Sequence, residues 1–351
     1  MLKRLSLILT ELEKLSLDGI LILSNANIAY LLNYPSRESA LLIFPERNYF
    51  LTDGRYKEEA QQKLSAVKVV EIKTSFGQVV KELCERHKIK NLGFEEKYLR
   101  VDQFLALRRI LKRKIRLKPI AGIVETFRQR KDKDEVSLIE KSADIAVKAM
   151  QYAAHLIKPG IKENEVAAEL ERFIRYQGAQ VAFPIIVASG SNSAFPHHLT
   201  SERKLQRNEP VLVDLGADFK GYKSDLTRVF FLGKINHSMK RIYEIVLAAQ
   251  KQAFSAVSPY RLAEEPDKAA RNYINKMGYG QFFCHSTGHG IGLEVHEEPK
   301  ISKRQLTKFM PGMVFTIEPA IYLPKKFGIR IEDMILVTEE GGKVISGTLY
   351  K

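Results

Sequence analysis

The sequence predicts two domains, an α/β domain over residues 1–122 and a second domain of helices followed by strands over residues 123–351. A length of 351 residues is enough for two domains. Up to about residue 122, short apolar runs alternate with amphipathic stretches, which is typical of an α/β domain with short connections. Beyond that point two long helical patterns precede a series of strand-like runs, and acidic residues interrupt several of these runs.

The first domain is predicted element by element from its apolar periodicity. Leu2, Leu5, Leu9 and Leu12 recur at helical spacing and mark one face of a first helix. We expect strands at 19–23, 40–44, 48–52, 67–72 and 91–95, and helices at 57–64, 75–87 and 101–111. No catalytic constellation is visible among these residues.

A basic run over residues 108–118 contributes to a formal net charge of +15. An anionic partner such as nucleic acid would suit such a charge. However, the run contains no aromatic side chain on which a base could stack. We expect it to form the solvated face of a helix and an edge strand, with Ile110, Leu111, Ile115 and Leu117 pointing inward. Nucleic acid is therefore not an expected partner.

The cysteine content and the distribution of apolar residues indicate the cellular compartment. Cys84 and Cys284 are the only cysteines and cannot form a disulfide framework, so we expect a reducing cytoplasm. Glu11, Glu13 and Lys14 interrupt the apolar N-terminal run, so that run does not read as a secretory signal. No run of about 18 apolar residues occurs, and no membrane association is expected.

The second domain is predicted to open with two helices. Apolar residues keep helical spacing from Val136 to Met150, and Pro159-Gly160 ends that helix. A second helix is expected from Asn164 to Tyr176, before Gly178.

Two aspartates then stand in apolar strand patterns, where Asp is normally depleted. Asp214 lies within the run 211–218, and Asp225 lies near the start of the run that ends at Phe231. A buried carboxylate is costly unless it is paired, protonated or bound to a metal ion. A glycine turn between the runs allows a hairpin that brings the two aspartates side by side. The alternative is that both residues cap turns at strand ends.

Glu318 and Glu332 repeat this pattern in two later apolar runs, 313–322 and 327–337. A further candidate is His289, which has glycines on both sides and lies between His285 and His296. Four buried like charges need cations to be tolerated together, and two divalent ions would balance them in number. An oxygen-rich set with one imidazole suits Mn, Co, Fe or Zn better than a thiolate site would.

These residues together resemble the dinuclear site of the pita-bread metallopeptidases, which include methionine aminopeptidase, aminopeptidase P and prolidase. The motifs that carry the resemblance are SGSNSAFPH at 189–197, GHGIGLEVHEEP at 288–299, TIEPAIY at 316–322 and GIRIED at 328–333. The steps from Asp214 to Asp225 and from His289 to His296 also match. The resemblance covers essentially the whole chain, and the first domain is similar to the front domain of the proline-specific branch. It implies an α+β pita-bread (creatinase/aminopeptidase-like) fold for residues 123–351.

The resemblance also implies roles for individual residues. Two divalent metal ions, Mn or Co in the first place and Zn or Fe as alternatives, would be held by Asp214, Asp225, His289, Glu318 and Glu332. Asp225 and Glu332 would bridge the two ions. A hydroxide that bridges them would attack the Xaa-Pro peptide bond, and Glu318 would also carry the proton. His197 and His296 would stabilise the oxyanion, while His285, Tyr322 and Arg330 would line the pocket and orient the ligands.

The expected function is therefore an exopeptidase acting on Xaa-Pro peptides, with a preference for dipeptides and a homodimeric assembly. An Xaa-Pro aminopeptidase acting on longer peptides is the alternative, since the motifs do not separate the two. A pita-bread protein without metal ions, acting as a binding module, is a more remote alternative. The chain departs from the proline-specific pattern at His198, Val229 and Lys300. The change at Lys300 puts recognition of the substrate carboxylate in doubt.

Overall fold

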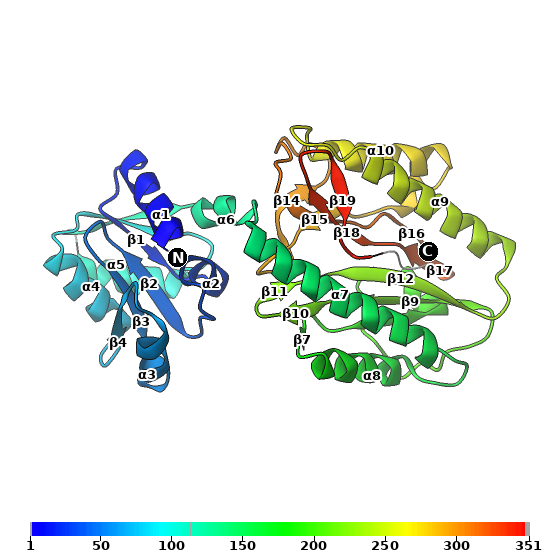
Figure 1. Cartoon of the computed structure of the whole chain (residues 1–351), viewed down its shortest axis with the longest axis horizontal. Helices are drawn as coiled ribbons and strands as arrows, with labels where there is room; N and C mark the ends of the chain where they lie inside the picture. The colour runs from blue at the N-terminus through cyan, green and yellow to red at the C-terminus, as the bar shows by residue number, and fades with distance from the viewer. Residues whose placement is uncertain (1, 113, 348–351) are drawn as a thin grey trace. The chain divides into compact units, whose positions relative to one another are not determined.

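A computed structural model describes residues 2–112 and 114–347 and contains two compact units, Met1–Arg128 (unit 1) and Gln129–Lys351 (unit 2) (Figure 1). Gly122 has a left-handed backbone, φ +66°, and the chain turns there. The next helix nevertheless stays with unit 1, because the Arg128 guanidinium donates to Asn27 Oδ1 at 2.7 Å. The end of unit 1 thus lies later than the 122/123 division expected from the sequence, and the residue-level domain boundary remains a prediction.

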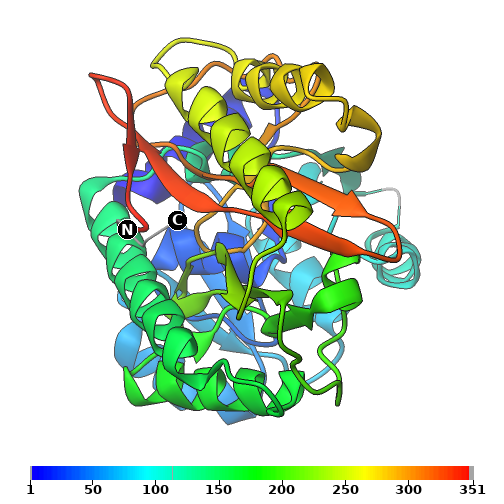
Figure 2. The ribbon, with the colours of Figure 1, turned by 90° about the vertical axis from the view of Figure 1, so that its right-hand side faces the viewer.

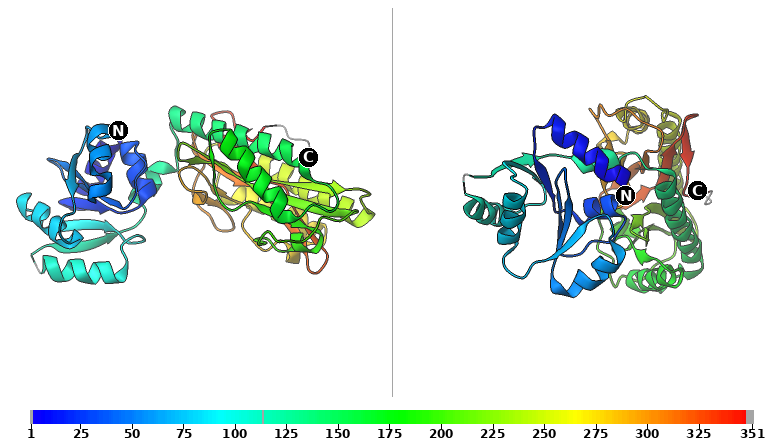
Figure 3. Two further views of the ribbon diagram at one scale, coloured as in Figure 1. Left: turned by 90° about the horizontal axis from the view of Figure 1, so that it is seen from below. Right: turned by 60° about the vertical axis from the view of Figure 1, so that its left-hand side comes forward.

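Unit 1 is built on a six-stranded sheet in the order β4-β3-β2-β1-β5-β6. Its strands are β1 Gly19–Ile22, β2 Ser39–Ile43, β3 Asn48–Thr52, β4 Lys68–Glu71, β5 Asn91–Glu95 and β6 Arg116–Ile120. Its helices are α1 Leu2–Lys14, α2 Asn25–Leu32, α3 Gly54–Lys63, α4 Phe76–Arg86, α5 Val101–Leu111 and α6 Ile123–Arg128. Figure 3 shows α4 and α5 on one face of the sheet, with α1 and α2 on the other. All the elements expected in this unit are present, and α2 and α6 are two further helices that were not predicted.

The basic run of unit 1 takes the form expected from its apolar residues. It covers the end of α5 and the edge strand β6, with Leu111 and Ile115 buried and Ile110 and Leu117 partly buried. Exposed lysines and arginines on an edge strand oppose pairing with a second chain. The interpretation as a solvated helix face and edge strand is therefore confirmed.

Unit 2 places strands between two pairs of helices (Figure 2). One pair is α7 Lys133–Leu156 and α8 Glu163–Tyr176, and the other is α9 His237–Ser255 and α10 Glu264–Lys276. The strands of the first half are β7 Gln180–Val181, β8 Ile186–Ser189, β9 Glu209–Leu215, β10 Ala217–Phe219, β11 Tyr222–Lys223 and β12 Leu226–Leu232. Those of the second half are β13 Gly288–Gly290, β14 Glu297–Ile301, β15 Val314–Ile317, β16 Ala320–Leu323, β17 Phe327–Arg330, β18 Asp333–Val337 and β19 Gly342–Val344. Helices α7 and α8 were predicted from the sequence, whereas α9 and α10 were not.

Two strands predicted in the second half of unit 2 are each interrupted, which corrects the interpretation of the sequence. The run 313–322 was expected to be one strand around Glu318, but β15 ends at Ile317 and β16 begins at Ala320. Pro319 has no N–H for a sheet ladder, which accounts for the interruption. The run 327–337 breaks likewise between β17 and β18, at Ile331-Glu332. Of the four acidic residues, only Asp214 lies inside a strand, and the other three lie between strands.

A search for membrane spans among the described residues finds no helix that combines the length and the apolar character needed to cross a bilayer.

Candidate metal centre

The first half of unit 2 brings Asp214 and Asp225 together. Strands β9 and β12 pair antiparallel, with Asp214 opposite Thr227, and Asp225 directly precedes β12. The connection between them forms the small β10–β11 pair. The expected hairpin is confirmed, with a short ribbon at its tip in place of a simple glycine turn.

The second half of unit 2 adds three further donors. Asp225, His289 and Glu332 each offer one ligand atom, and these atoms lie within 4.8 Å of one another. The Nε2 atom of His289 lies 3.6 Å from Asp225 Oδ2 and 3.5 Å from Glu318 Oε1. All five residues predicted as ligands thus lie in one region of unit 2, held by strands from both halves.

The tautomer of His289 suits metal binding. Its Nδ1 donates to the carbonyl oxygen of Gly290 at 3.1 Å, so the lone pair on Nε2 faces the carboxylates. Burial lowers the pKa of His289 and keeps the ring neutral. The flanking glycines allow close approach of the backbone, because a Cβ at Gly288 would overlap the carbonyl oxygen of Thr316.

The carboxylate cluster needs cations, because the protein leaves two of its buried oxygens without a partner. Asp214 Oδ1 and Asp225 Oδ1 are both buried without a hydrogen-bond partner. Burial, followed by the charges of Glu332, Asp214 and Glu318, raises the pKa of Asp225 well above its usual range. Burial also raises the pKa values of Glu318 and Glu332. Orphaned carboxylate oxygens beside a neutral imidazole are the environment that a divalent metal ion satisfies, so the donor set fits such an ion.

Arg330 connects the cluster to two neighbouring side chains. Its guanidinium donates to Asp214 Oδ2 at 2.5 Å and to Tyr322 Oη at 2.7 Å. The Tyr322 hydroxyl in turn donates to His285 Nε2 at 3.1 Å. Burial raises the pKa of Tyr322 to about 12 and lowers that of His285, so both groups are neutral near pH 7. The three residues expected around the metal ligands therefore form one hydrogen-bonded chain that ends on Asp214.

The two remaining predicted residues, His296 and His197, stand at the edge of the cluster. The ring of His296 lies 4.3 Å from that of His289, centroid to centroid. Burial, and then the His289 ring, lowers the pKa of His296, and His197 is close enough to add to this effect. His197 itself is exposed on the loop after β8.

The loop that carries His197 is anchored by Glu163, a fully buried residue at the start of α8. Glu163 accepts hydrogen bonds from the Ser189 and Ser201 hydroxyls and lies 2.9 Å from His198 Nε2. These contacts fix the loop on both sides of His197.

Several side chains that support the cluster were not predicted from the sequence. Thr227 Oγ1 donates to Glu332 Oε2 at 2.6 Å and accepts from Arg330 Nε at 3.1 Å. The next residue, Arg228, forms a buried ion pair with Asp333, with 2.7 Å between the guanidinium nitrogen and the carboxylate oxygen. A signal was present, because Arg228 and Asp333 are further charged residues inside apolar runs. Tyr222 packs among buried apolar residues and donates to Glu135 at 2.9 Å.

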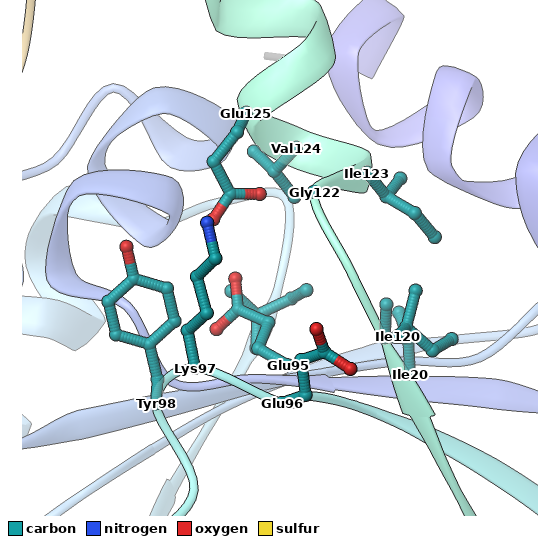
Figure 4. Close-up of a pocket in the computed structure, with 11 residues that line it drawn as sticks. Ile20, Glu95, Glu96, Lys97, Tyr98, Ile120, Gly122, Ile123, Val124 and Glu125 are labelled. Carbon is teal, nitrogen blue, oxygen red and sulfur yellow. The ribbon is translucent and has the colours of Figure 1, made fainter. Parts of the chain in front are cut away.

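Unit 1 contains a separate small pocket at the carboxyl ends of β1, β5 and β6 (Figure 4). Its buried acid, Glu95, accepts hydrogen bonds from the backbone N–H groups of Leu23 and Ser24 and from Asn27 Nδ2. Burial raises the pKa of Glu95. Since the carboxylate is bonded within the protein on both oxygens, we assign no ligand to this pocket.

Comparisons with known proteins agree with this site. The model of metallopeptidase family M24 matches residues 137–339, and that of the creatinase/prolidase N-terminal domain matches residues 4–130. A Xaa-Pro dipeptidase of Pyrococcus horikoshii is 38% identical over 356 residues, which cover 97% of this chain and 96% of the relative.

Solved structures give the same picture. An Xaa-Pro dipeptidase from Bacillus anthracis superposes with a TM-score of 0.96 at 36% identity, over 100% of this chain and 98% of that one. An X-Pro aminopeptidase from Thermotoga maritima MSB8 has a TM-score of 0.89 at 34% identity, over 97% and 98%. The resemblance and the fold class predicted from the sequence are confirmed. The chain belongs to metallopeptidase family M24, a family that implies divalent metal ions, and combines a creatinase/prolidase N-terminal domain with a pita-bread catalytic domain.

Proposed function

We propose that this enzyme hydrolyses Xaa-Pro peptide bonds, with dipeptides as the preferred substrates. The observation that carries the proposal is the pair of buried, unbonded carboxylate oxygens of Asp214 and Asp225 beside the neutral His289. Relatives named as Xaa-Pro dipeptidases align over nearly the whole chain, which supports the choice of substrate.

The proposed metal ligands are Asp214, Asp225, His289, Glu318 and Glu332, with Asp225 and Glu332 shared between two ions. Two divalent cations, Mn or Co in preference to Zn or Fe, would lower the pKa of a shared water toward neutrality and polarise the substrate carbonyl. The charge balance supports this set, since Arg330 is the one Lys or Arg side chain in the described part of the chain that forms an ion pair with any of the four carboxylates.

The chain's own residues supply proton transfer and oxyanion stabilisation. Glu318 has a pKa raised by burial, which suits a group that accepts a proton and then donates it. His296 is neutral and adjacent to His289, and it can donate a hydrogen bond to the developing oxyanion. His197 is proposed to share that role from its exposed loop, where it also meets incoming substrate.

A second candidate is an Xaa-Pro aminopeptidase that acts on longer peptides. It is favoured by the structural match to the Thermotoga maritima X-Pro aminopeptidase. Both candidates use the same ligand set and differ only in the substrate length that is accepted. As expected from the sequence, we further propose that the protein is cytoplasmic and that it forms a homodimer. Light scattering of the purified chain checks the homodimer.

The test is a comparison of matched peptides with the Mn²⁺-loaded protein. We expect Leu-Pro to be cleaved faster than Leu-Pro-Gly, and Leu-Gly to be cleaved poorly. A faster rate on Leu-Pro-Gly would favour the aminopeptidase instead. Removal of metal by a chelator should abolish both activities, and added Mn²⁺ or Co²⁺ should restore them.

The matched control is Glu332→Gln, which keeps the side-chain volume and removes one ligand charge. This variant should bind Mn²⁺ weakly and show no cleavage. If wild type hydrolysed none of the three peptides while holding its metal ions, the proposed substrate class would be wrong although the metal centre stood.

A further inference from the structure

Helix α9 carries a polar residue, Gln250, on the face that it buries. The neighbouring buried residues of this face, such as Val246, Ala249 and Ala253, are apolar. Gln250 is only 3% exposed. A buried amide lowers stability unless it is hydrogen-bonded, so its position calls for specific partners.

The Nε2 atom of Gln250 lies within hydrogen-bond distance of three acceptors. It is 3.3 Å from the carbonyl oxygen of Ile317 and 3.2 Å from that of Ile331. It is 3.0 Å from Asp333 Oδ2. Ile317 immediately precedes Glu318, and Ile331 immediately precedes Glu332.

These two carbonyls lie where two antiparallel ribbons meet. Strands β15 and β18 pair with Ile317 opposite Asp333, while β16 and β17 pair with Ala320 opposite Arg330. The chain crosses from one ribbon to the other at 318–319 and returns at 331–332, and each crossing carries one acidic ligand. One amide therefore contacts both crossings.

Arg228 completes the support on the second crossing. It donates to the carbonyl oxygen of Glu332 at 2.5 Å and pairs with Asp333. The backbone of Glu332 is thus held on both sides by buried donors. At the Glu318 crossing, Gln250 contacts the carbonyl oxygen of Ile317, and the N–H of Glu318 donates to the carbonyl oxygen of Thr287 at 2.8 Å.

We propose that Gln250 is a positioning residue that sets the separation of Glu318 and Glu332, and through it the geometry and affinity of the metal centre. The proposal rests on the proposed metal site. Supporting groups around metal ligands typically change affinity or activity by about 10–100-fold when they are removed. Gln250 contacts the carbonyl oxygens of Ile317 and Ile331, so it acts through the backbone that positions Glu318 and Glu332.

The test compares Gln250→Met, which fills the space without a donor, with Gln252→Met, an exposed glutamine on the same helix. Three quantities are measured on the full chain: Mn²⁺ affinity by calorimetry, the visible absorption spectrum of the Co²⁺-loaded protein, and kcat and KM on Leu-Pro. Gln250→Met should bind Mn²⁺ roughly tenfold more weakly, show a shifted Co²⁺ spectrum, and lose kcat with little change in KM. Gln252→Met should match wild type in all three.

A purely structural role predicts a different result. Gln250→Met would then melt at a lower temperature, yet the folded protein would keep the wild-type Mn²⁺ affinity and Co²⁺ spectrum, and this result would overturn the proposal. Should Gln250→Met fail to fold, Gln250→Glu keeps the shape, and the same spectral shift is expected of it. If wild type left Leu-Pro uncleaved, the proposed function would fail, while the affinity and the spectrum would still decide the role of Gln250.

Discussion

Arg330 and Asp214 form a buried ion pair in which one carboxylate oxygen is bonded at 2.5 Å and the other, Oδ1, has no hydrogen-bond partner. The guanidinium thereby fixes the orientation of the carboxylate and leaves one oxygen for a metal ion. Burial disfavours the charged guanidinium, but Tyr322 and the surrounding carboxylates hold the pKa of Arg330 above its usual value. This relationship gives Arg330 an effect on both stability and metal binding.

Two substitutions of Arg330 distinguish the effect of its charge from the effect of its hydrogen-bond geometry. Arg330→Lys keeps the charge, but one ammonium cannot reproduce the contacts to Asp214, Tyr322 and Thr227. We expect kcat to fall roughly 10–100-fold with the fold retained. Arg330→Met breaks a buried ion pair and should destabilise the metal-free protein by about 3–5 kcal/mol. Denaturant unfolding and steady-state kinetics measure the two effects. The exposed Arg241→Met serves as control, and equal losses in Arg330→Lys and Arg241→Met would refute the assigned geometry.

Much of the fold was predictable because its elements obey local rules. The strands of unit 1 are short apolar runs between turns, and α7 and α8 keep a clear helical period. The missed helix α10 begins Glu264-Glu265-Pro266, a polar start that gives little apolar signal. Likewise α2 spans only Asn25–Leu32, too short for a period to show. Pro319 is a local signal for the strand break at Glu318, whereas the break at Glu332 depends on how two ribbons meet, which no local pattern records.

The site residues that could be predicted are those that are unusual for their place in the sequence. An acid in an apolar run, such as Asp214 or Glu332, is visible in the sequence because burying it is costly. Gln250 is not visible in the same way, because a glutamine in an amphipathic helix is unremarkable until its buried face is known. Glu163 shows no anomaly either, since an acid in the first turn of a helix is expected. Residues that act on the backbone of others therefore escape sequence reasoning.

The loop that carries His197 should depend on Glu163. Glu163→Gln keeps the shape but replaces one accepting oxygen by a donor opposite the Ser189, Ser201 and His198 contacts. Leaving such buried groups unpaired costs roughly 1–3 kcal/mol. We expect kcat to fall roughly tenfold as well, because misplacing a group by a fraction of an ångström slows the reaction. Thermal unfolding and kinetics on Leu-Pro measure both.

The destabilisation should depend on pH in a defined direction. Burial favours the neutral acid, yet the hydrogen bonds from Ser201, Ser189 and His198 hold the pKa of Glu163 below its ordinary value. The stability conferred by ionised Glu163 is therefore full above the unfolded-state pKa of about 4.3 and is lost as the pH falls through the lower folded-state pKa. The stability gap between wild type and Glu163→Gln should be constant near pH 7 and shrink below about pH 4. Glu171→Gln, in a surface pair with Arg175, should show almost no gap. A gap that grew on acidification would contradict the assignment.

His296 should affect catalysis without affecting metal content. It lies beside His289, with 4.3 Å between the two ring centroids, at the edge of the cluster. His296→Ala removes a hydrogen-bond donor for the oxyanion, which is worth roughly 10²–10³ in kcat. Elemental analysis should find the same metal content as in wild type. Loss of metal ions from this variant would move His296 from the oxyanion side to the ligand set.

The Asp225 carboxylate should be tolerated only because cations share it. Asp225→Asn keeps the size and removes one of four crowded negative charges. Burial, and then the repulsion between these charges, raises the pKa of Asp225 well above its usual range. The metal-free variant should therefore be at least as stable as metal-free wild type. Thermal unfolding of the two metal-free proteins, prepared with a chelator, measures this comparison.

Adding Mn²⁺ should reverse that order. Ligand bound only by the native state stabilises by RT ln(1 + [L]/Kd), or about 2.7 kcal/mol at a hundredfold excess over Kd. For a unit of this size that corresponds to a rise in Tm of roughly 5–10 °C in wild type, whereas Asp225→Asn loses one oxygen of a proposed metal ligand and its Tm should rise far less. The binding-module alternative expects no Mn²⁺-dependent shift in either protein. If wild type melted at the same temperature with and without Mn²⁺, the dinuclear site would be refuted, and with it the reason why four carboxylates are crowded together here.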